Sequence, residues 1–423
     1  MRMEQKLDIE NKWLKPFNIL YYFLFAGFFN YSFMGSTMLY GEYLYKYFND
    51  FVKIYDFLYE ILLGLTIFTI IFLHKGVKEK IFPITMLVAV MLHDHFREFT
   101  TVLNLATFVM LVISAKGKSY KVIGIISLIS GWSWIITSAI ACKMGKVPDV
   151  VFGNRHSFGS IYMTDLACHF LTLMMVICVI RKGKLKIWEY GISLMLMAVN
   201  ILYMKAKVGF LCLFILMAGT FYYQYIMPHS QVNIGVKRIY KKTCLFAILI
   251  LAPLMLYLTA TFTTDPDMFY NKIGVLDTIR ARLMLGRQAL DQYPITMWGV
   301  YVREKGNGGS TTGIVTDYFF LDISYIRLLF KEGVVILGIV IAMFVKLQKR
   351  LADSKCIYLM FVVLVFIIDC SIEHHIIELS YSLLPYLLYC NESVGKDSAV
   401  SPNQVQLFAN MLPRFKSQSN KQI

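Results

Sequence analysis

The chain has 423 residues, of which 57% are hydrophobic and only 16% are charged. An average soluble domain is about 45–50% apolar and about 25% charged, so this composition argues against a soluble enzyme, a disordered chain or a secreted disulfide scaffold. The formal net charge of +15 would indicate nucleic acid binding in a soluble protein. In a membrane protein the positions of the charges matter more than their sum.

Long apolar runs recur along the whole chain. A helix needs about 20 residues to cross the hydrocarbon core of a membrane, and the runs predict an all-α polytopic protein with about twelve transmembrane helices. The third, fourth, eleventh and twelfth runs are short, and each pair flanks a tight polar turn, so each pair is expected to form a helical hairpin or to include a re-entrant segment. In chain order the runs are Phe17–Leu39, Ile54–Leu73, Ile81–Leu92, Phe99–Ser114, Val122–Ala141, Ile161–Ile180, Ile187–Met204, Val208–Met227, Thr243–Phe262, Gly333–Leu347, Cys356–Cys370 and Ile376–Cys390.

The distribution of Lys and Arg predicts the orientation of these spans. With the N-terminus placed in the cytoplasm, the cytoplasmic segments hold 26 of the 42 basic residues. Eight of the other sixteen lie in one long segment, and long segments cross a membrane regardless of their charge. We therefore expect both termini to be cytoplasmic. The net charge then reports topology and attraction to anionic inner-leaflet lipid, not nucleic acid binding.

One connection, Thr263–Glu332, is much longer than the others and contains no convincing span. It is rich in Leu, Ile, Tyr and Phe, which argues against disorder, and connections of this length are usually functional when they are ordered. We expect a single membrane domain (1–423) with an extracytoplasmic segment (263–332) between the ninth and tenth spans. Residues 391–423 are expected to form a polar cytoplasmic tail.

A helix is predicted inside the extracytoplasmic segment, lying at the membrane surface on an apolar face with period 3.6. That face consists of Leu276, Ile279, Leu283 and Leu290. Arg280 and Arg287 are two turns apart at the edge of this face, whereas Arg282 points elsewhere. Guanidinium groups match phosphate oxygens bidentately, so Arg280 and Arg287 are candidate phosphate ligands. Alternatively, they extend from an interfacial helix into the headgroups without binding a ligand.

Asp322 is the candidate acid–base group. A helix is predicted to start near Asp322 and to run to Gly333, so Asp322 is either an N-terminal capping residue or a general base at the membrane mouth. A second basic element, Asn154–Gly159, precedes the sixth span on the same side of the membrane. Its Arg155 is placed to reach an anionic headgroup.

Ionisable residues within membrane spans are costly and often functional. Asp165 and His169 are four residues apart in the sixth span, so they share a helix face and are expected to pair. Asp369 ends the eleventh run and is followed by the turn residues Glu373–His375. A transporter would use such groups as a proton relay, and the alternative is hydrogen-bonded packing and turn residues.

No metal site and no nucleotide site are expected. The eight cysteines lie in or beside apolar runs without a CxxC pair, which is typical of packing residues. His93–His95 resembles a ligand cluster but has no matching third site. Neither a GxGxxG nor a Walker A motif is present, so any reaction must use a substrate that is activated elsewhere.

Several short motifs between about Lys116 and Tyr389 follow the order found in another class of membrane protein. Asn154–Gly159 is similar to an "R-S-hydrophobic-G-F" element that opens a span. Leu285–Arg287, followed by Pro294 and Trp298–Gly299, looks like an "R … P-hydrophobic-hydrophobic-G" run. Both elements are those of the bacterial surface-polysaccharide polymerases of the Wzy type, which are relatives of the O-antigen ligases.

Two further motifs carry the same resemblance. Asp322–Tyr325, with Gly333 and Gly338 behind it, is similar to the "D-x-x-Y … G … G" element of these polymerases, whereas the ligases place a histidine at the position of Asp322. The ending Glu373–His375 before a short last span is also polymerase-like. The family tends to have an arginine after the seventh-span tyrosine, but here Lys205 and Lys207 follow Tyr203, which keeps the charge and loses the guanidinium.

The resemblance implies a GT-C-like membrane glycosyltransferase in the bacterial cytoplasmic membrane that polymerises a capsule, exopolysaccharide or O-antigen. The donor would be a glycan on polyprenyl (undecaprenyl) diphosphate, and the acceptor a single repeat unit on the same carrier. Because the diphosphate is a good leaving group, transfer with inversion would need no metal and no other cofactor. Membrane lipid, a chain-length regulator and a flippase are the expected partners, and nucleic acid is not.

The resemblance also implies roles for individual residues. Arg280 and Arg287 would bind the diphosphate with help from Arg155. Asp322 would be the base that deprotonates the acceptor, with His375 as the second candidate. Additional substrate contacts are expected from Tyr325, Arg327 and Lys207.

Two other function classes remain open. A carrier or lipid-linked oligosaccharide flippase usually shows internal repeats and interrupted helices, whereas here one asymmetric external segment favours the enzyme. A cell-wall glycan polymerase of the shape, elongation and division class would use the same carrier chemistry, and composition does not distinguish it.

Overall fold

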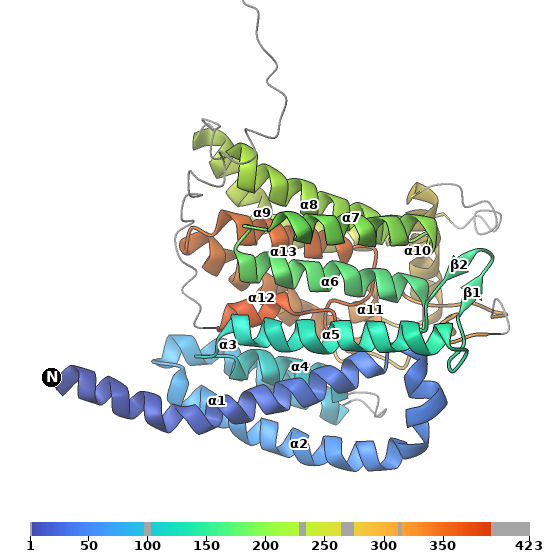
Figure 1. Cartoon of the computed structure of the whole chain (residues 1–423). Helices are drawn as coiled ribbons and strands as arrows, with labels where there is room; N and C mark the ends of the chain where they lie inside the picture. The colour runs from blue at the N-terminus through green and yellow to red at the C-terminus, as the bar shows by residue number, and fades with distance from the viewer. Residues whose placement is uncertain (1, 97–102, 228–233, 264–274, 312–314, 391–423) are drawn as a thin grey trace, which may run out of the picture.

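The computed structural model describes residues 2–96, 103–227, 234–263, 275–311 and 315–390. Within them the chain is mostly helical, and α1–α9, α12 and α13 run roughly along one direction as a single bundle (Figure 1). The C-terminal tail predicted for residues 391–423 lies outside the described residues. The first eleven predicted apolar runs each coincide with a helix.

The helices have the following bounds. The α-helices are α1 (Arg2–Met34), α2 (Phe48–Phe68), α3 (Val77–Phe96), α4 (Leu103–Ser114), α5 (Tyr120–Lys143), α6 (Met163–Arg181), α7 (Ile187–Leu202), α8 (Lys207–Phe221), α9 (Ile234–Ala260), α10 (Val275–Gln292), α11 (Ser324–Arg327), α12 (Gly333–Asp353) and α13 (Ile357–Asp369). Short π- or 3₁₀-helical turns are η1 (Tyr40–Leu44), η2 (Tyr45–Tyr47), η3 (Thr69–Leu73), η4 (Tyr222–Ile226), η7 (Leu328–Glu332) and η8 (Leu384–Leu388). Strands β1 (Val151–Phe152) and β2 (Arg155–His156) form an antiparallel hairpin.

Six helical stretches of the described chain are long and apolar enough to cross a membrane. They are Asp50–Leu73, Tyr120–Lys143, Met163–Arg181, Lys207–Ile226, Arg238–Ala260 and Ser324–Asp353. The 24 residues of α5 rise by about 36 Å, which exceeds the ~30 Å hydrocarbon core. Together with shorter apolar helices in the same bundle, these stretches support an all-α membrane-embedded protein, and the number of twelve spans stays a prediction.

The outer surface of the bundle is apolar. Ile129 on α5, Leu194 on α7 and Tyr257 on α9 are each 65% exposed. Large apolar side chains with this exposure are unfavourable in water and favourable against lipid chains. The buried interior of the bundle is also apolar and is rich in aromatic side chains. The outer surface and the interior of the bundle therefore both suit a membrane environment.

The twelfth predicted run, Ile376–Cys390, is not a helix, so the predicted helical hairpin between the last two runs is wrong. The segment is irregular, ends in η8 and is buried inside the bundle. Pro385 provides no backbone N–H, and the hydroxyl of Thr172 on α6 donates to the carbonyl of Tyr381 at 3.1 Å. Irregular backbone is tolerated at membrane depth where protein surrounds it, which is the situation here.

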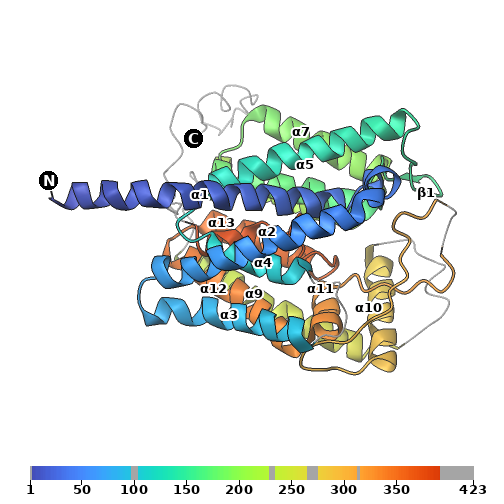
Figure 2. The same cartoon turned by 90° about the horizontal axis from the view of Figure 1, so that it is seen from below.

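The parts of residues 263–332 that the structure describes gather at one end of the bundle. Helix α10 stands across the ends of the other helices, next to α11 (Figures 1 and 2). The β1–β2 hairpin lies at the same end, and the first turns of α1 lie at the opposite end. The expected helix near Leu276–Leu290 is therefore present as α10. It was expected to lie on the membrane surface, whereas in the structure it covers the end of the bundle.

Gly299 and Gly333 lie where this end of the molecule meets the start of α12. The N–H of Val300 donates to the carbonyl of Phe330 at 2.8 Å, and the N–H of Val335 donates to the carbonyl of Met297 at 3.2 Å. Gly333 has φ +87°, and a Cβ there would lie 2.4 Å from the Met297 carbonyl oxygen. A side chain at this position would separate the two segments, which explains the glycine at position 333 of the predicted motif.

Candidate functional site

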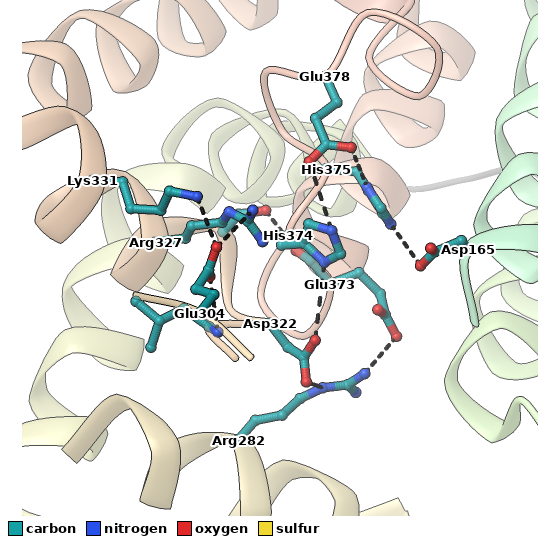
Figure 3. Close-up of polar contacts among 12 residues, drawn as sticks. Asp165, Arg282, Glu304, Asp322, Arg327, Lys331, Glu373, His374, His375 and Glu378 are labelled. Atoms are coloured by element: carbon teal, nitrogen blue, oxygen red, sulfur yellow. Dashed lines mark hydrogen bonds and ion pairs between the residues drawn. The ribbon is translucent and has the colours of Figure 1, made fainter. Parts of the chain in front are cut away.

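Arg282 on α10 is the centre of a buried group of charges. The helix is buried from Ala281 to Gly286, and Arg282 is only 8% exposed. Its Nε donates to Oδ2 of Asp322 at 3.2 Å, and its Nη2 donates to Oε1 of Glu373 at 2.9 Å (Figure 3). Its Nη1 is buried and has no hydrogen-bond partner among the described residues. The guanidinium therefore holds two carboxylates and keeps one N–H group for a further acceptor.

Both carboxylates are positioned by short backbone links. Helix α11 starts at Ser324 with Ile323 as its N-cap, so Asp322 precedes the helix and does not cap it. The N–H of Ser324 donates to the carbonyl of Cys370 at 3.1 Å, and its hydroxyl donates to the carbonyl of Glu373 at 2.5 Å. These bonds fasten the segment that carries Asp322 to the turn that carries Glu373.

The turn after α13 adds two histidines to the group. His374 lies between Asp322 and Glu378, with nitrogen–oxygen distances of 3.9 and 3.6 Å. His375 Nδ1 is 2.8 Å from Oε2 of Glu378, and its Nε2 is 3.8 Å from Oδ1 of Asp165 on α6. Figure 3 shows these side chains converging from three parts of the chain. The site thus joins α6, α10, the segment before α11 and the irregular segment after α13.

A column of stacked rings leads from the site into the bundle. The ring of His375 stacks on Tyr381 at 3.7 Å, Tyr381 stacks on His169 at 3.9 Å, and His169 stacks on Phe33 of α1 at 3.9 Å. His169 Nε2 is 2.7 Å from the hydroxyl of Ser36. The column fixes the plane of the His375 ring, because rotation would break its face-to-face contact with Tyr381.

A second charged group lies beside the first. Oε2 of Glu304 is 3.1 Å from Arg327 and 2.7 Å from Lys331, and its Oε1 accepts the backbone N–H of Leu321 at 3.2 Å. Phe320 packs between the two groups, with the guanidinium of Arg327 4.8 Å from its ring centre. Glu304 thereby fixes the residue that precedes Asp322.

Burial and neighbouring charges set the protonation states. The pKa of Arg282 is raised, because Glu373 and Asp322 outweigh the effect of burial, so Arg282 stays charged. Burial raises the pKa of Glu373 and lowers that of His374, which is neutral at pH 7. Burial acts against protonation of His375, but Glu378 and Asp165 overcome it and raise its pKa to about 9. Charged Arg282 thus faces Asp322 and Glu373, and protonated His375 faces Glu378 and Asp165.

The arginines predicted for the diphosphate have other surroundings than Arg282. Arg280 is exposed on α10. Arg287 is 2.8 Å from Asp291 and donates to the carbonyl of Ala260 at 2.8 Å. Arg155, in β2, donates to the carbonyl of Met204 and lies over the ring of Tyr162, which directly precedes α6. The contacts described for Arg287 and Arg155 lie outside the group around Arg282.

The other residues predicted to bind substrate lie in different surroundings. The hydroxyl of Tyr325 is buried and donates to the carbonyl of Ile367 at 2.8 Å, which is a packing role between α11 and α13. Arg327 belongs to the Glu304 group, and Lys207 is the exposed first residue of α8. The expected pair between Asp165 and His169 is replaced by the contacts of these residues with His375 and Ser36.

Sequence reasoning missed Arg282 and Glu304. Arg282 was expected to point away from the apolar face of its helix, and it does, but the turn after α13 and the segment at Asp322 cover that side too. A usable signal was the uneven charge count. The acids Asp322, Asp369 and Glu373 required a nearby cation, and the arginine flanked by Ala281 and Leu283 was available.

The arrangement suits chemistry on an anion and a hydroxyl group. A preorganised guanidinium stabilises negative charge that develops on a leaving group, and a nearby carboxylate accepts a proton. Three overlapping sets of side chains here also have metal-ligating atoms within 4.8 Å of one another, and each set includes at least one residue of the turn Glu373–His375.

Comparisons with known proteins returned no match to this chain among protein-family models, curated proteins or solved structures. The resemblance to the polysaccharide polymerases therefore stays a prediction from short motifs, and the architecture established for the chain is that of an all-α membrane-embedded protein.

Proposed function

We propose that this protein is a membrane glycosyltransferase that polymerises a bacterial cell-surface polysaccharide on the outer leaflet of the cytoplasmic membrane. The observation that carries the proposal is the buried contact of Arg282 with Asp322 and Glu373, at the end of an apolar bundle and under helix α10. A lipid-linked substrate in the membrane would reach this end with its diphosphate at headgroup level.

The proposed step transfers a glycan between two lipid-linked substrates. Asp322 takes the proton of the acceptor hydroxyl, the hydroxyl oxygen bonds to the anomeric carbon, and the bond from that carbon to the diphosphate breaks. The electron pair leaves with the diphosphate, whose growing charge is stabilised by the free Nη1 of Arg282. We keep Arg280, Arg287 and Arg155 as further diphosphate ligands, which a diphosphate could reach only by extending beyond the Arg282 group. Inversion at the anomeric carbon follows from a single displacement.

The proposed orientation places this end outside the cell. Lys118 precedes α5 and Arg350 lies in the last turn of α12, at the opposite end of the bundle. Cytoplasmic ends of membrane helices carry such an excess of basic residues. Both termini are then cytoplasmic, and the polymer grows outside.

The decisive experiment is polymerisation by the purified full-length chain. Lipid vesicles containing the chain and polyprenyl-diphosphate-linked repeat units are expected to produce a ladder of longer lipid-linked glycans. Asp322→Asn keeps the shape of the side chain but removes the proton acceptor, so the rate should fall by about 10²–10⁴-fold. Asp317→Asn is the matched control, because Asp317 lies in the same segment but is 85% exposed. Unchanged polymerisation by Asp322→Asn would exclude this residue as the base.

A transporter is the second candidate, and one observation favours it. The buried irregular segment Ile376–Cys390 begins beside Asp165, His375 and Glu378, and transporters commonly place unwound backbone and titratable groups together. The two functions differ in what accumulates after gene deletion. A polymerase defect leaves single lipid-linked repeat units on the outer leaflet, whereas a flippase defect leaves them on the inner leaflet.

A further inference from the structure

Two histidines and one aspartate meet where α6 passes the turn after α13. The metal-ligating atoms of Asp165, His374 and His375 all lie within 4.8 Å of one another. His375 Nε2 and Asp165 Oδ1 are 3.8 Å apart, which is too long for a hydrogen bond and close to the spacing of two ligands on one metal ion. The three residues come from two distant parts of the sequence, so the fold creates this group.

The His375 ring is oriented as it is in protein metal sites. Its Nδ1 lies 2.8 Å from Glu378 Oε2, which leaves Nε2 directed at Asp165. A ligating histidine almost always donates its other ring N–H to a carboxylate, and this fixes the tautomer. His375 is 3% exposed, and its Nε2 has no hydrogen-bond partner in the described part of the chain. The stacking of the ring on Tyr381 holds this direction.

The local charge also favours a divalent ion. Arg282 pairs with Asp322 and Glu373 but not with the other two acids. The ion pairs described for Asp165 and Glu378 involve only the two histidines. A proton on His375 offsets only one of these two carboxylates, whereas a divalent ion bound by neutral imidazoles would offset both.

The other two metal-capable sets are less suitable. One consists of Cys168, Glu373 and His375, and the other of Asp322, Glu373 and His374. Both contain Glu373, whose Oε1 lies 2.9 Å from the guanidinium of Arg282. A fixed positive charge at that distance repels a dication, whereas no arginine or lysine is described in an ion pair with Asp165.

We propose that Asp165, His374 and His375 bind one divalent transition-metal ion, with Glu378 as the carboxylate that orients His375. Two imidazole nitrogens and one carboxylate oxygen suit zinc and neighbouring ions, and leave coordination positions for water or a substrate oxygen. This goes beyond the proposed polymerase function and does not depend on it. It also departs from the sequence-based expectation that the chain holds no metal.

The test measures metal binding by the purified full-length chain in detergent, with tags removed and after treatment with a chelator. The probes are Zn²⁺, measured by competition with a chromogenic chelator, and Co²⁺, whose d–d absorption reports nitrogen and oxygen ligands. We expect one equivalent of Zn²⁺ per chain and its loss in both Asp165→Asn and His375→Gln. Glu378→Gln should retain the site with about 10–100-fold weaker affinity, as for other carboxylates that orient a metal-ligating histidine.

His156→Gln is the matched control, because His156 also pairs with an acid, Asp149 at 2.7 Å, at the same end of the molecule. It should bind Zn²⁺ like the wild type. Two ligand variants are used so that a folding defect in one leaves the other informative. Added Zn²⁺ should raise the melting temperatures of the wild type and of His156→Gln, but not those of the two ligand variants. The proposal would be overturned if the wild type bound no metal, or if both ligand variants bound Zn²⁺ as tightly as the wild type. Metal binding without polymerisation would leave this site intact and reject the proposed function.

Discussion

The guanidinium of Arg282 lies 3.2 Å from the carboxylate of Asp322, although forty positions separate the two residues in the chain. This contact joins α10 to the start of α11, and the same guanidinium reaches Glu373 in the turn after α13. One side chain therefore holds three segments of the candidate site together. Its removal should affect both the stability of the protein and its activity.

Arg282→Gln is expected to destabilise the protein. The variant leaves Asp322 and Glu373 as buried acids without a cation, and breaking a buried ion pair in this way costs about 3–5 kcal/mol. Thermal unfolding in detergent measures the loss. Arg280→Gln is the control, since this arginine is exposed on the same helix and its loss should cost far less. Equal effects of the two variants would show that Arg282 does not carry the packing of the site.

Arg287→Lys tests the proposed diphosphate site. Lysine keeps the positive charge but loses the two-point contact that Arg287 makes with Asp291, at 2.8 and 3.3 Å, and that a diphosphate would take over. Polymer should decrease sharply while the protein still reaches the membrane, as gel analysis and immunoblotting of membranes would show. Asp291→Asn frees Arg287 and should not decrease polymer. Normal chain length in Arg287→Lys would remove this residue from the diphosphate site.

Gly333→Ala is expected to be strongly destabilising. The residue has φ +87°, which costs a residue with a side chain about 1–3 kcal/mol, and its Cβ would also meet the Met297 carbonyl oxygen at 2.4 Å. Gly338, the second glycine of the same motif, is the control. A Cβ there meets nothing within 4 Å inside α12, so Gly338→Ala should be neutral or stabilising by about 0.5–1 kcal/mol. Melting temperatures of the two variants should therefore shift in opposite directions or differ by several degrees.

His74 predicts a pH dependence at the end of the bundle away from the site. It lies between η3 and α3, is 1% exposed, and contacts the ring of Tyr389. Burial and nearby Lys116 lower its pKa from 6.5 to about 4. Between these values the unfolded chain binds a proton that the folded chain does not, so the free energy of unfolding decreases as the pH falls from about 6.5 to 4.

The loss that His74 contributes is on the order of 3 kcal/mol down to pH 4, of which about 2 kcal/mol is already lost by pH 5. His74→Phe keeps an aromatic ring without a titratable group, and its melting temperature should decrease less than that of the wild type between pH 7.5 and pH 5. Other acids and histidines titrate in both proteins, so the difference between the two profiles isolates His74. Parallel profiles would contradict the lowered pKa.

The helices were predictable because their signals are local. Apolar runs, helix period and basic flanks locate α1–α9, and the predicted helix near Leu276–Leu290 corresponds to α10. The site was only partly predictable, because its members depend on which distant segments pack against one another in the folded protein. Amphipathic period separates the two faces of α10 but cannot show that a turn some ninety residues later, at Glu373, buries the face that carries Arg282.

The twelfth run shows a second limit of the same kind. An apolar segment that is surrounded by protein needs no helical period, so composition alone did not distinguish a helix from the irregular Ile376–Cys390. Asp322 illustrates the opposite case. Its position just before a short helix was compatible with an N-terminal capping role. Only the contact with Arg282 shows that Asp322 belongs to the site instead.

The irregular segment also has a consequence for how the protein is made. Its contacts come from α1, where Phe25 packs on Tyr386, from α4 and α6, and from α12, where Arg350 donates to the carbonyl of Cys390. Backbone without its own ladder of hydrogen bonds cannot enter lipid alone, so this segment must insert after those helices have assembled. Because His375 and Glu378 lie at its start, the ribosome must finish nearly the whole described chain before the site exists. A prematurely ended chain would therefore reach the membrane without the means to act there.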